Sequence, residues 1–379
     1  MVSWRPVGGA LLLSIITAMP LLAGEPLDAN LGHGDDKTGI VWYDIRHLGL
    51  EGQGWTATKA PFDRLPAKAE SMVRKPVWDL SQQSAGLCVR FESDSPSIDA
   101  RWMLTSTNLA MSHMAATGVS GLDLYVMTKA GWHWLAVGRP ESAPNNSVHL
   151  VAGLPAGRRT YLLYLPLYNG VKSVELGLPA GQQLRKAEPY PAGHDKPVLF
   201  YGTSITQGGC ASRPGMVHTA IIGRWLRRPV INLGFSGNGR MEPELATLLA
   251  ELDPAVYVLD CLPNMPAKDV VERVEPFVLT LRKSRPHTPI LLVEDRTLAN
   301  AFLLPNKHKT NAMHREALRS GYERLVSRGV EGLSYLPGET LLGDDGEGTV
   351  DSSHPTDLGF MRQAQAFNAV LAPLLEHSN

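Results

Sequence analysis

Residues 200–210 read FYGTSITQGGC, and their first two residues close the apolar run KPVLFY that begins at Lys196. The run has the length and composition of a fully buried strand, and it breaks at Gly202 into small and hydroxylic residues. A buried strand that opens into Gly-Thr-Ser is typical of the edge of a parallel sheet at which ligands bind. Ser204 therefore has two interpretations: its hydroxyl caps the next helix, or it is a nucleophile presented at a strand-to-helix turn.

The alternation of apolar strands and amphipathic helices continues to the end of the chain. The strand candidates are PVLFYG, VINLGF, AVYVLD, PILLVED and GLSYL, and the helix candidates are HTAIIGRWLRR, PELATLLAEL, DVVERVEPFVLTLRKS, MHREALRSGYERLVSRG and a final helix from about Asp357. Continuous apolar strands separated by helices predict a parallel sheet covered on both faces. We expect residues 196–376 to form a three-layer, doubly wound α/β domain with its ligand site at the carboxyl ends of the strands.

Residues 27–180 show a different pattern of short alternating segments divided by turn residues. The segments are GIVWYDI, GLCVRFES, SIDARWML, GLDLYVMT, WHWLAVG, RTYLLYLPL and SVELGL, and helical periodicity is weak among them. Short aromatic and β-branched runs with turns at regular intervals predict an antiparallel β-sandwich. The polar, Pro-rich link GQQLRKAEPYPAGHDKP, residues 181–197, is the expected domain boundary.

Composition limits the partners of the protein. The 379 residues carry 36 Lys and Arg against 37 Asp and Glu, so no global field favours nucleic acid or an anionic membrane surface. Residues 1–24 place one Arg before a short apolar run and small residues, which predicts a cleaved signal peptide and a secreted or periplasmic protein; an uncleaved anchor is the alternative. No later run is long enough to span a membrane, so we expect no stable membrane insertion after cleavage.

Three cysteines, Cys88, Cys210 and Cys261, are too few for a disulfide framework, and we interpret them as buried free thiols. Export would permit one bridge, and a pairing of Cys210 with Cys261 is left open. No Cys/His cluster has the paired spacing of a structural zinc site, so the sequence predicts no metal and no other cofactor.

The segment VDSSHPTDLG near the end of the chain supplies a partner for a nucleophilic serine. A serine hydroxyl needs a histidine to take its proton and a third group to orient that histidine. Asp351 and His354 have the spacing that lets a carboxylate reach Nδ1 and leaves Nε2 free for Ser204. The alternative is an Asx-type turn with an exposed histidine.

Acyl transfer also needs donors aimed at the oxygen that becomes negative. Gly237 in NLGFSGNGR follows the second strand and permits a close backbone approach, and Asn264 in LDCLPNM follows the third. We expect the backbone N–H groups of Ser204 and Gly237 and the Asn264 amide to form an oxyanion hole. Alternatively, Gly237 serves a turn and Asn264 caps the helix that begins near Asp269.

Together these residues resemble the SGNH hydrolase superfamily, also called GDSL-like esterases, from about Lys196 to Leu375. The blocks GTSIT, NLGFSG, PN and DSSHP stand for its serine, glycine, asparagine and Asp-His blocks. Two departures affect the loops of the pocket: the serine block has Thr203 where the family name implies Asp, and the asparagine block lacks the usual Gly-x-Asn-Asp. The resemblance implies catalytic Ser204, His354 and Asp351.

The segment ATGVSGLDLY, Ala116 to Tyr125, resembles the Gly-x-Asp-Leu-Tyr domain that precedes a subgroup of SGNH esterases. The resemblance implies a jelly-roll-like β-sandwich packed on the catalytic domain. From the residues alone, Asp123 is either a buried structural carboxylate, which we favour, or a catalytic one.

The combined prediction is an exported serine esterase that hydrolyses short acyl esters, acetyl above all; the resemblance implies a carbohydrate substrate, because exported esterases of this two-domain kind resemble carbohydrate esterases. Six of the eight Trp residues lie in the front half, where they either stack on sugar rings or fill the sandwich core: Trp42, Trp55, Trp78, Trp102, Trp132 and Trp134. Arg213 and Arg296 either bind an acidic sugar or pair with carboxylates. The alternatives are a catalytically silent carbohydrate-binding protein and a lipase or thioesterase that uses the same site. The sequence leaves the oligomeric state open.

Overall fold

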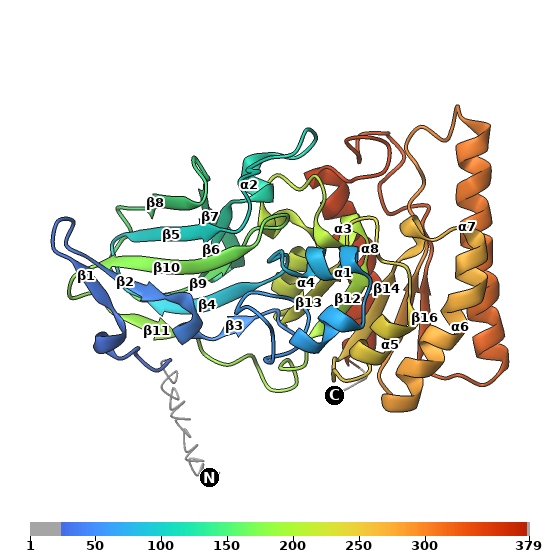
Figure 1. Ribbon diagram of the computed structural model, residues 1–379, viewed down its shortest axis with the longest axis horizontal. Helices are drawn as coiled ribbons and strands as arrows, with labels where there is room; N and C mark the ends of the chain where they lie inside the picture. The colour runs from blue at the N-terminus through green and yellow to red at the C-terminus, as the bar shows by residue number, and fades with distance from the viewer. Residues whose placement is uncertain (1–23, 377–379) are drawn as a thin grey trace, which may run out of the picture.

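The computed structural model describes residues 24–376 of the chain. An antiparallel β domain and an α/β domain lie side by side along the long axis of the molecule (Figure 1). The predicted signal peptide, residues 1–24, lies outside the described residues except for Gly24. Among the helices of residues 24–376, none is long and apolar enough to cross a membrane.

The front domain is the antiparallel sandwich that the sequence predicts. One sheet has the order β1-β2-β10-β5-β8 and the other the order β11-β4-β9-β6-β7, with β3 also paired to β4. Its strands are β1 (His33–Asp35), β2 (Ile40–Asp44), β3 (Leu50–Glu51), β4 (Cys88–Ser93), β5 (Ile98–Leu104), β6 (Leu122–Thr128), β7 (Gly131–Gly138), β8 (Asn145–Val151), β9 (Arg159–Tyr164), β10 (Val171–Pro179) and β11 (Leu184–Lys186). The seven predicted strands are all present. The sequence missed β8, whose Asn, Ser and His residues hide the alternation, and β1, β3 and β11, which are only two or three residues long.

The sandwich core follows from strand alternation, since successive side chains point to opposite faces of a sheet. Along β5 every second residue is buried, from Ile98 through Trp102 to Leu104. The other sheet contributes Phe91 and Tyr161, whose rings stack at 5.2 Å between centroids. The two inner faces therefore share one apolar layer.

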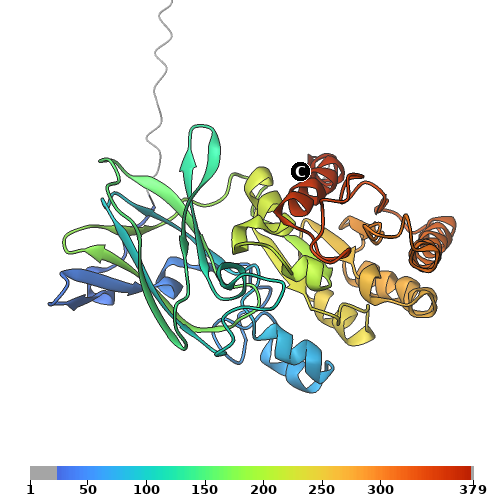
Figure 2. The same cartoon turned by 90° about the horizontal axis from the view of Figure 1, so that it is seen from above.

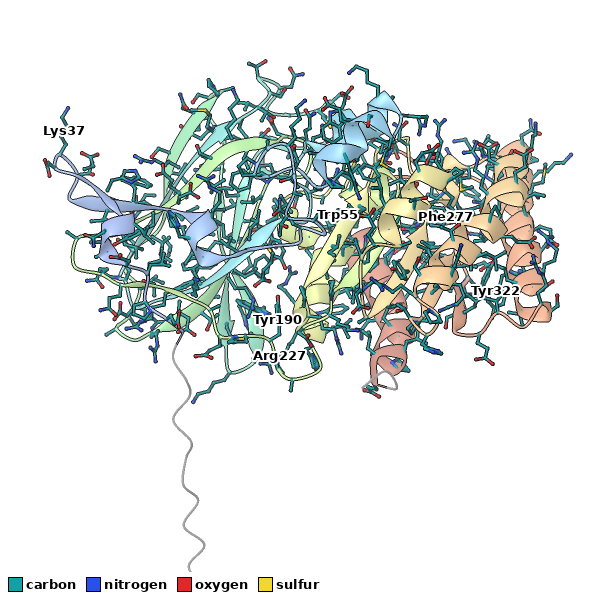
Figure 3. The ribbon with its side chains drawn as sticks, turned by 60° about the horizontal axis from the view of Figure 1, so that its bottom comes forward. Lys37, Trp55, Tyr190, Arg227, Phe277 and Tyr322 are labelled. Carbon is teal, nitrogen blue, oxygen red and sulfur yellow. The ribbon has the colours of Figure 1, made fainter. Side chains whose placement is uncertain are left out.

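One part of the front half leaves the sandwich and covers the α/β domain. The 3₁₀ helix at Ala67–Ser71 buries Ala69, and helix α1 (Lys75–Ser81) buries Val77 and Trp78, against the core of that domain. Trp55 lies at the same junction (Figure 3) and donates from Nε1 to Glu251 at 3.0 Å. The sequence did not predict α1, because two turns are too short to show a helical period.

The α/β domain, which lies to the right of the sandwich in Figure 2, contains a five-stranded parallel sheet of order β13-β12-β14-β15-β16. Its strands are β12 (Val198–Gly202), β13 (Val230–Gly234), β14 (Val256–Asp260), β15 (Ile290–Val293) and β16 (Leu333–Leu336), and its helices are α3 (Ser204–Gln207), α4 (His218–Leu226), α5 (Pro243–Leu249), α6 (Ala267–Ser284), α7 (Pro305–Ser327) and α8 (Asp357–Glu376). The predicted parallel sheet and helices are present. Helix α7 begins at Pro305, earlier than the pattern suggested.

Helices cover both faces of this sheet. Tyr201 and Leu259 belong to the cluster that α5, α6 and α7 complete, whereas Phe200 and Val258 pack with α4 and α8. Because each strand alternates between two buried faces, it reads as a continuous apolar run. The three-layer, doubly wound prediction is therefore confirmed.

The strand register brings several loops to one edge of the sheet. Gly202 at the end of β12 pairs with Gly234 of β13 and with Asp260 of β14. These three neighbouring strands therefore end at the same level, and the residues that follow them start from a common rim.

Candidate active site

Ser204 is the first residue of α3, immediately after β12, and it is buried. The N-cap of this short helix is Thr203, whose hydroxyl accepts from the Ile205 N–H at 3.3 Å. The Ser204 hydroxyl therefore does not cap this helix. Its Oγ lies 2.8 Å from Nε2 of His354. The capping interpretation of Ser204 is wrong.

The loop before α8 holds His354 in position through Asp351. Nδ1 of His354 lies 2.7 Å from Oδ2 of Asp351, and Oδ1 of the same carboxylate accepts the backbone N–H of His354 at 2.8 Å. The Asx-type turn is therefore present and serves to orient the histidine. Burial of Asp351 acts to raise the pKa of the carboxyl, but hydrogen bonds from the backbone and ring of His354 and the backbone of Ser353 outweigh it and lower that pKa.

Gly237 occupies a tight turn after β13. Its φ of +69° is one that glycine adopts without strain, and a side chain there would meet open space. Within residues 24–376 no group accepts a hydrogen bond from the N–H of Gly237 or from that of Ser204. Both donors remain available to a ligand.

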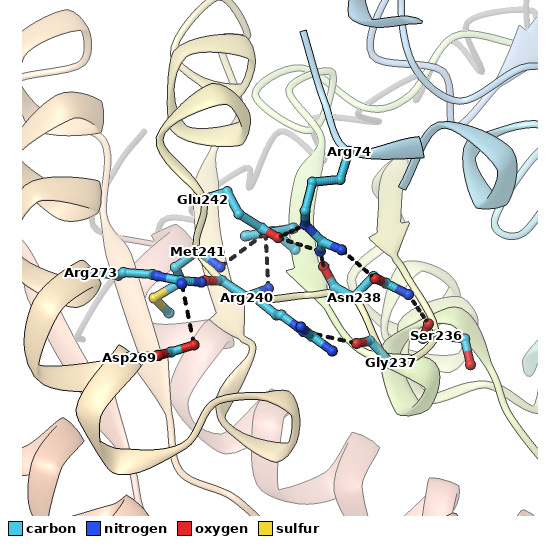
Figure 4. A network of polar contacts seen from close by, with 10 residues as sticks. Arg74, Ser236, Gly237, Asn238, Arg240, Met241, Glu242, Asp269 and Arg273 are labelled. Atoms are coloured by element: carbon cyan, nitrogen blue, oxygen red, sulfur yellow. Dashed lines mark hydrogen bonds and ion pairs between the residues drawn. The ribbon is translucent and has the colours of Figure 1, made fainter. Parts of the chain in front are cut away.

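A polar network braces this turn, as Figure 4 shows. Arg74 donates to Oδ1 of Asn238 at 2.8 Å and pairs with Glu242, and Nδ2 of Asn238 donates to the Ser236 carbonyl at 2.7 Å. Nε of Arg240 donates to the carbonyl of Gly237 at 3.1 Å. The front segment that carries Arg74 therefore supports the backbone around Gly237.

Asn264 ends the 3₁₀ turn Leu262–Asn264 that follows β14. It does not cap α6, which begins at Ala267 with Pro266 as its N-cap residue. Among the described residues, the Asn264 side chain has no hydrogen bond, and its Oδ1 is buried. A partly buried amide without a protein partner at the rim of the sheet is suited to contact a ligand.

The front domain adds residues that the sequence analysis did not find. Oη of Tyr168 donates to the carbonyl of Ser204 at 3.0 Å, and the ring of His113 packs edge-on against His354 with 5.7 Å between centroids. A side chain at Gly209 would come within 3.1 Å of the His354 ring. Neither Tyr168 nor His113 carries a local motif, so only the packing of the two domains identifies them.

A groove of about 600 Å³ lies between the domains beside the Gly237 turn. Tyr168 and Ser236 line it next to the candidate site. The lining also has the uncharged polar residues Gln82, Gln83, Thr105, Ser106, Asn108, Asn169 and Asn238, together with one carboxylate, Asp79, and the apolar residues Pro76, Leu80, Met111 and Val119. Hydroxyl and amide groups of this kind suit a neutral, hydroxyl-rich ligand.

The two candidate arginines have internal partners. Arg213 donates to Oδ2 of Asp123 at 2.9 Å, and Arg296 is buried against Asp260 and Gln363. Asp123 is fully buried and also accepts from the Gly215 N–H at 2.7 Å. The structural interpretation of Asp123 therefore holds, and both arginines pair with carboxylates.

Most of the tryptophan and cysteine side chains considered as site candidates are buried in the protein interior. Trp42, Trp78 and Trp102 are buried, whereas Trp134 is 49% exposed. All three cysteines are free and buried, which excludes a bridge between Cys210 and Cys261 in this structure.

Two protein families match this chain. Residues 195–372 match the GDSL-like Lipase/Acylhydrolase family, and residues 40–184 match a family described as the N-terminus of SGNH-hydrolase-type esterases. Among curated proteins, no sequence matches the chain.

Solved structures resemble the whole molecule. A protein described as a GDSL-like lipase from Bacteroides ovatus is 34% identical, with a TM-score of 0.84, over 89% of this chain and 98% of its own. A salicylyl-acyltransferase from a tetracycline biosynthetic pathway is 21% identical, with a TM-score of 0.69, over 90% of this chain and 97% of its own. A family two carbohydrate esterase from Clostridium thermocellum in complex with cellohexaose is 15% identical, with a TM-score of 0.54, over 76% of this chain and 92% of its own. The last two likenesses concern the fold alone.

Proposed function

Because the chain belongs to the GDSL-like lipase/acylhydrolase family of serine hydrolases, we propose that Ser204 attacks the carbonyl carbon of a carboxylic ester. His354 takes the serine proton at Nε2, and Asp351 stabilises the resulting imidazolium through Nδ1. The protonated His354 then donates this proton to the leaving alkoxide, so an alcohol departs and an acyl-enzyme remains. Water, activated by the neutral His354, releases the acid and regenerates Ser204.

The negative oxygen of each tetrahedral intermediate requires donors. The unpaired N–H groups of Ser204 and Gly237, with the Asn264 amide, are the groups available for this role. The observation that carries the proposal is the continuous chain from Ser204 Oγ to His354 Nε2 at 2.8 Å and from His354 Nδ1 to Asp351 at 2.7 Å.

We propose that the substrate is a short acyl ester, most simply an acetyl ester, on a carbohydrate. The groove beside the site supports this class, because its uncharged hydroxyl and amide groups match the hydroxyl groups of a neutral sugar. Similarity of fold to a carbohydrate esterase that binds cellohexaose adds support. An exported location, which the first 24 residues predict, would bring the enzyme to polysaccharides outside the cytoplasm.

The test of the chemistry compares p-nitrophenyl acetate hydrolysis by the full chain and by Ser204→Ala. We expect the variant to lose at least about 10³-fold in turnover, because the nucleophile itself is removed. Ser327→Ala on the exposed end of α7 is the matched control and should keep the full rate. Equal rates for Ser204→Ala and the unsubstituted protein would refute the esterase, and sugar binding without turnover would favour a carbohydrate-binding protein.

A lipase is the second candidate, and one surface feature favours it. Phe302 and Leu303 are 86% and 73% exposed, in a connection whose Ala299 N–H donates to the Ser352 carbonyl at 3.0 Å. The connection that carries these exposed apolar side chains is therefore joined at Ala299 to the loop of Asp351 and His354. Acetate release from acetylated xylan and pectin, with rates that fall as the acyl chain lengthens, would support the carbohydrate esterase, whereas a preference for long chains would support the lipase.

A further inference from the structure

Three side chains from distant parts of the chain meet beside Ser204. His113 comes from the front domain, Cys210 from the loop after α3, and His354 from the loop before α8. One candidate ligand atom from each residue lies within 4.8 Å of those of the other two. We propose that they form an inhibitory site for a zinc-type divalent cation, which switches the esterase off by taking its general base; this regulation depends on the role of His354 proposed above.

The donor set fits this class of ion. Two imidazoles and one thiolate are the nitrogen and sulfur ligands that Zn²⁺ prefers, and three protein ligands leave a fourth position open. Tetrahedral bonds of about 2.0–2.3 Å would place the ligand atoms roughly 3.3–3.8 Å apart, so the groups need to approach by about 1 Å. Rotation of the His113 side chain, which has no hydrogen-bond partner among the described residues, can supply much of this movement.

His354 is already oriented as a metal ligand would be. Its Nδ1 faces Asp351 at 2.7 Å, which is the carboxylate–histidine arrangement that commonly supports zinc. The other nitrogen, Nε2, points to Ser204, and the neighbouring ring carbon faces the backbone of Gly209, next to Cys210. A metal bound at Nε2 would occupy the lone pair that accepts the serine proton.

The backbones of the other two residues present their side chains at this point. Met111 and Met114 exchange backbone hydrogen bonds of 3.0 and 3.1 Å, and His113 lies in the turn that they close. Cys210 has a φ of +73°, a conformation that costs a non-glycine residue on the order of 1–2 kcal/mol. Within residues 24–376 neither the His113 ring nor the Cys210 thiol has a hydrogen-bond partner.

Binding of the cation exchanges the Cys210 thiol proton for a metal–sulfur bond. The cation forms bonds to two imidazole nitrogens and to the Cys210 sulfur, and the thiol proton passes to solvent. No electron transfer takes place, so removal of the ion by a chelator restores the free His354. Zinc inhibition should therefore be reversible.

The first measurement is independent of esterase activity. Co²⁺ added to the full chain and to Ser204→Ala should give a thiolate-to-cobalt charge-transfer band with one ion per chain, and Cys210→Ser should lack it. Cys210→Gly serves as a second variant, because glycine accepts the positive φ without strain. The absence of the band from the unsubstituted protein would overturn the metal site, whereas a band without any esterase activity would leave the site standing and refute the proposed function.

The second measurement is the zinc inhibition constant of each variant, taken relative to its own metal-free rate. His113→Ala and Cys210→Ser should raise this constant by at least about 10- to 100-fold. Mutation of a residue that only hydrogen-bonds to a zinc ligand already lowers metal affinity by this factor. His308→Ala, on the exposed surface of α7, is the matched histidine control and should leave the constant unchanged. Equal inhibition of all four proteins would overturn the proposal.

Discussion

Asn264 illustrates how a single residue gains a role from its neighbours. In the chain it resembles a helix cap, but Pro266 stands at the N-cap of α6 and leaves the amide without a protein partner. The hydrogen-bonding capacity of the amide is therefore free for substrate, and its removal should leave the folded state almost unchanged.

Asn264→Ala should lower kcat for p-nitrophenyl acetate by about 10²–10³-fold with little change in KM, because the lost donor acts on the transition state. Thermal unfolding followed by circular dichroism should match that of the unsubstituted protein. Asn306→Ala, on the exposed start of α7, is the control. Unchanged kcat in Asn264→Ala would remove this amide from the oxyanion hole.

Asp295 makes stability depend on pH. The carboxyl is buried beside Arg296, and burial raises its pKa to about 6, although that arginine opposes the shift. An unfolded Asp has a pKa of about 3.9, so between pH ~4 and ~6 the folded state binds more protons than the unfolded state. The contribution of Asp295 to the free energy of unfolding therefore decreases as pH rises through this window.

Asp295→Asn should raise the Tm at pH 7.5, because it removes a buried charge and keeps an oxygen that accepts from Asn311. The gain should shrink as the pH is lowered toward 4, where the native carboxyl is neutral. Tm values at pH 7.5, 5.5 and 4.5 measure this, with the exposed Asp94→Asn as control. A gain that grows at low pH would contradict the assigned direction.

At the scale of elements, the turn after β13 depends on a segment from the front half of the chain. Arg74 precedes α1 and binds both Asn238 and Glu242, on either side of the turn that exposes the Gly237 N–H (Figure 4). Since a donor misplaced by about 1 Å can cost about 10²-fold in rate, this brace should matter for turnover.

Arg74→Met should lower kcat by about 10- to 100-fold with a smaller change in KM, and Arg74→Lys should recover part of the loss through its remaining charge. Steady-state kinetics on a soluble acetyl ester measure both effects. Arg46→Met removes a local surface pair with Asp44 and is the control. A change in KM alone would indicate that Arg74 binds substrate and does not position the turn.

At the scale of the whole molecule, the Gly-x-Asp-Leu-Tyr motif joins the two domains. Asp123 on β6 accepts from Arg213 and from the Gly215 N–H, and Tyr125 accepts from the same arginine at 2.5 Å. Both donors belong to the loop between α3 and α4, which follows the Ser204 turn. The sandwich is thereby held against the candidate site that Tyr168 and His113 enter.

Asp123→Ala should lower the free energy of unfolding by on the order of 3–5 kcal/mol, because it leaves the partly buried Arg213 unpaired. Asp123→Asn keeps an acceptor for Gly215 and should lose less. Urea denaturation provides the measurement, and Glu70→Ala, which breaks an exposed pair with Lys59, is the control. A loss of unfolding free energy as small as that of the control would refute the proposed stabilising contact between Asp123 and Arg213.

Most of the fold could be predicted from local sequence patterns. Strands buried on both faces read as continuous apolar runs, strands of the sandwich alternate, and both signals are visible over a few residues. Short or polar elements such as α1 and β8 lacked enough length or contrast to show a period. Ser204, Gly237 and Asn264 were predicted as site residues because parallel strands bring their carboxyl ends to one edge, and Asp351 and His354 were predicted from their spacing and from the resemblance to SGNH hydrolases.

The sequence by itself determined the two domain types and the edge of the sheet where chemistry is expected, since hydrophobic periodicity and strand polarity are local properties. Only the tertiary structure decided that Tyr168 and His113 reach Ser204 and His354, that Arg213 and Arg296 pair internally, and that Cys210 lies beside two histidines. The reason is physical: contacts between distant segments arise from the packing of whole layers, and no short stretch of chain encodes the distance between them.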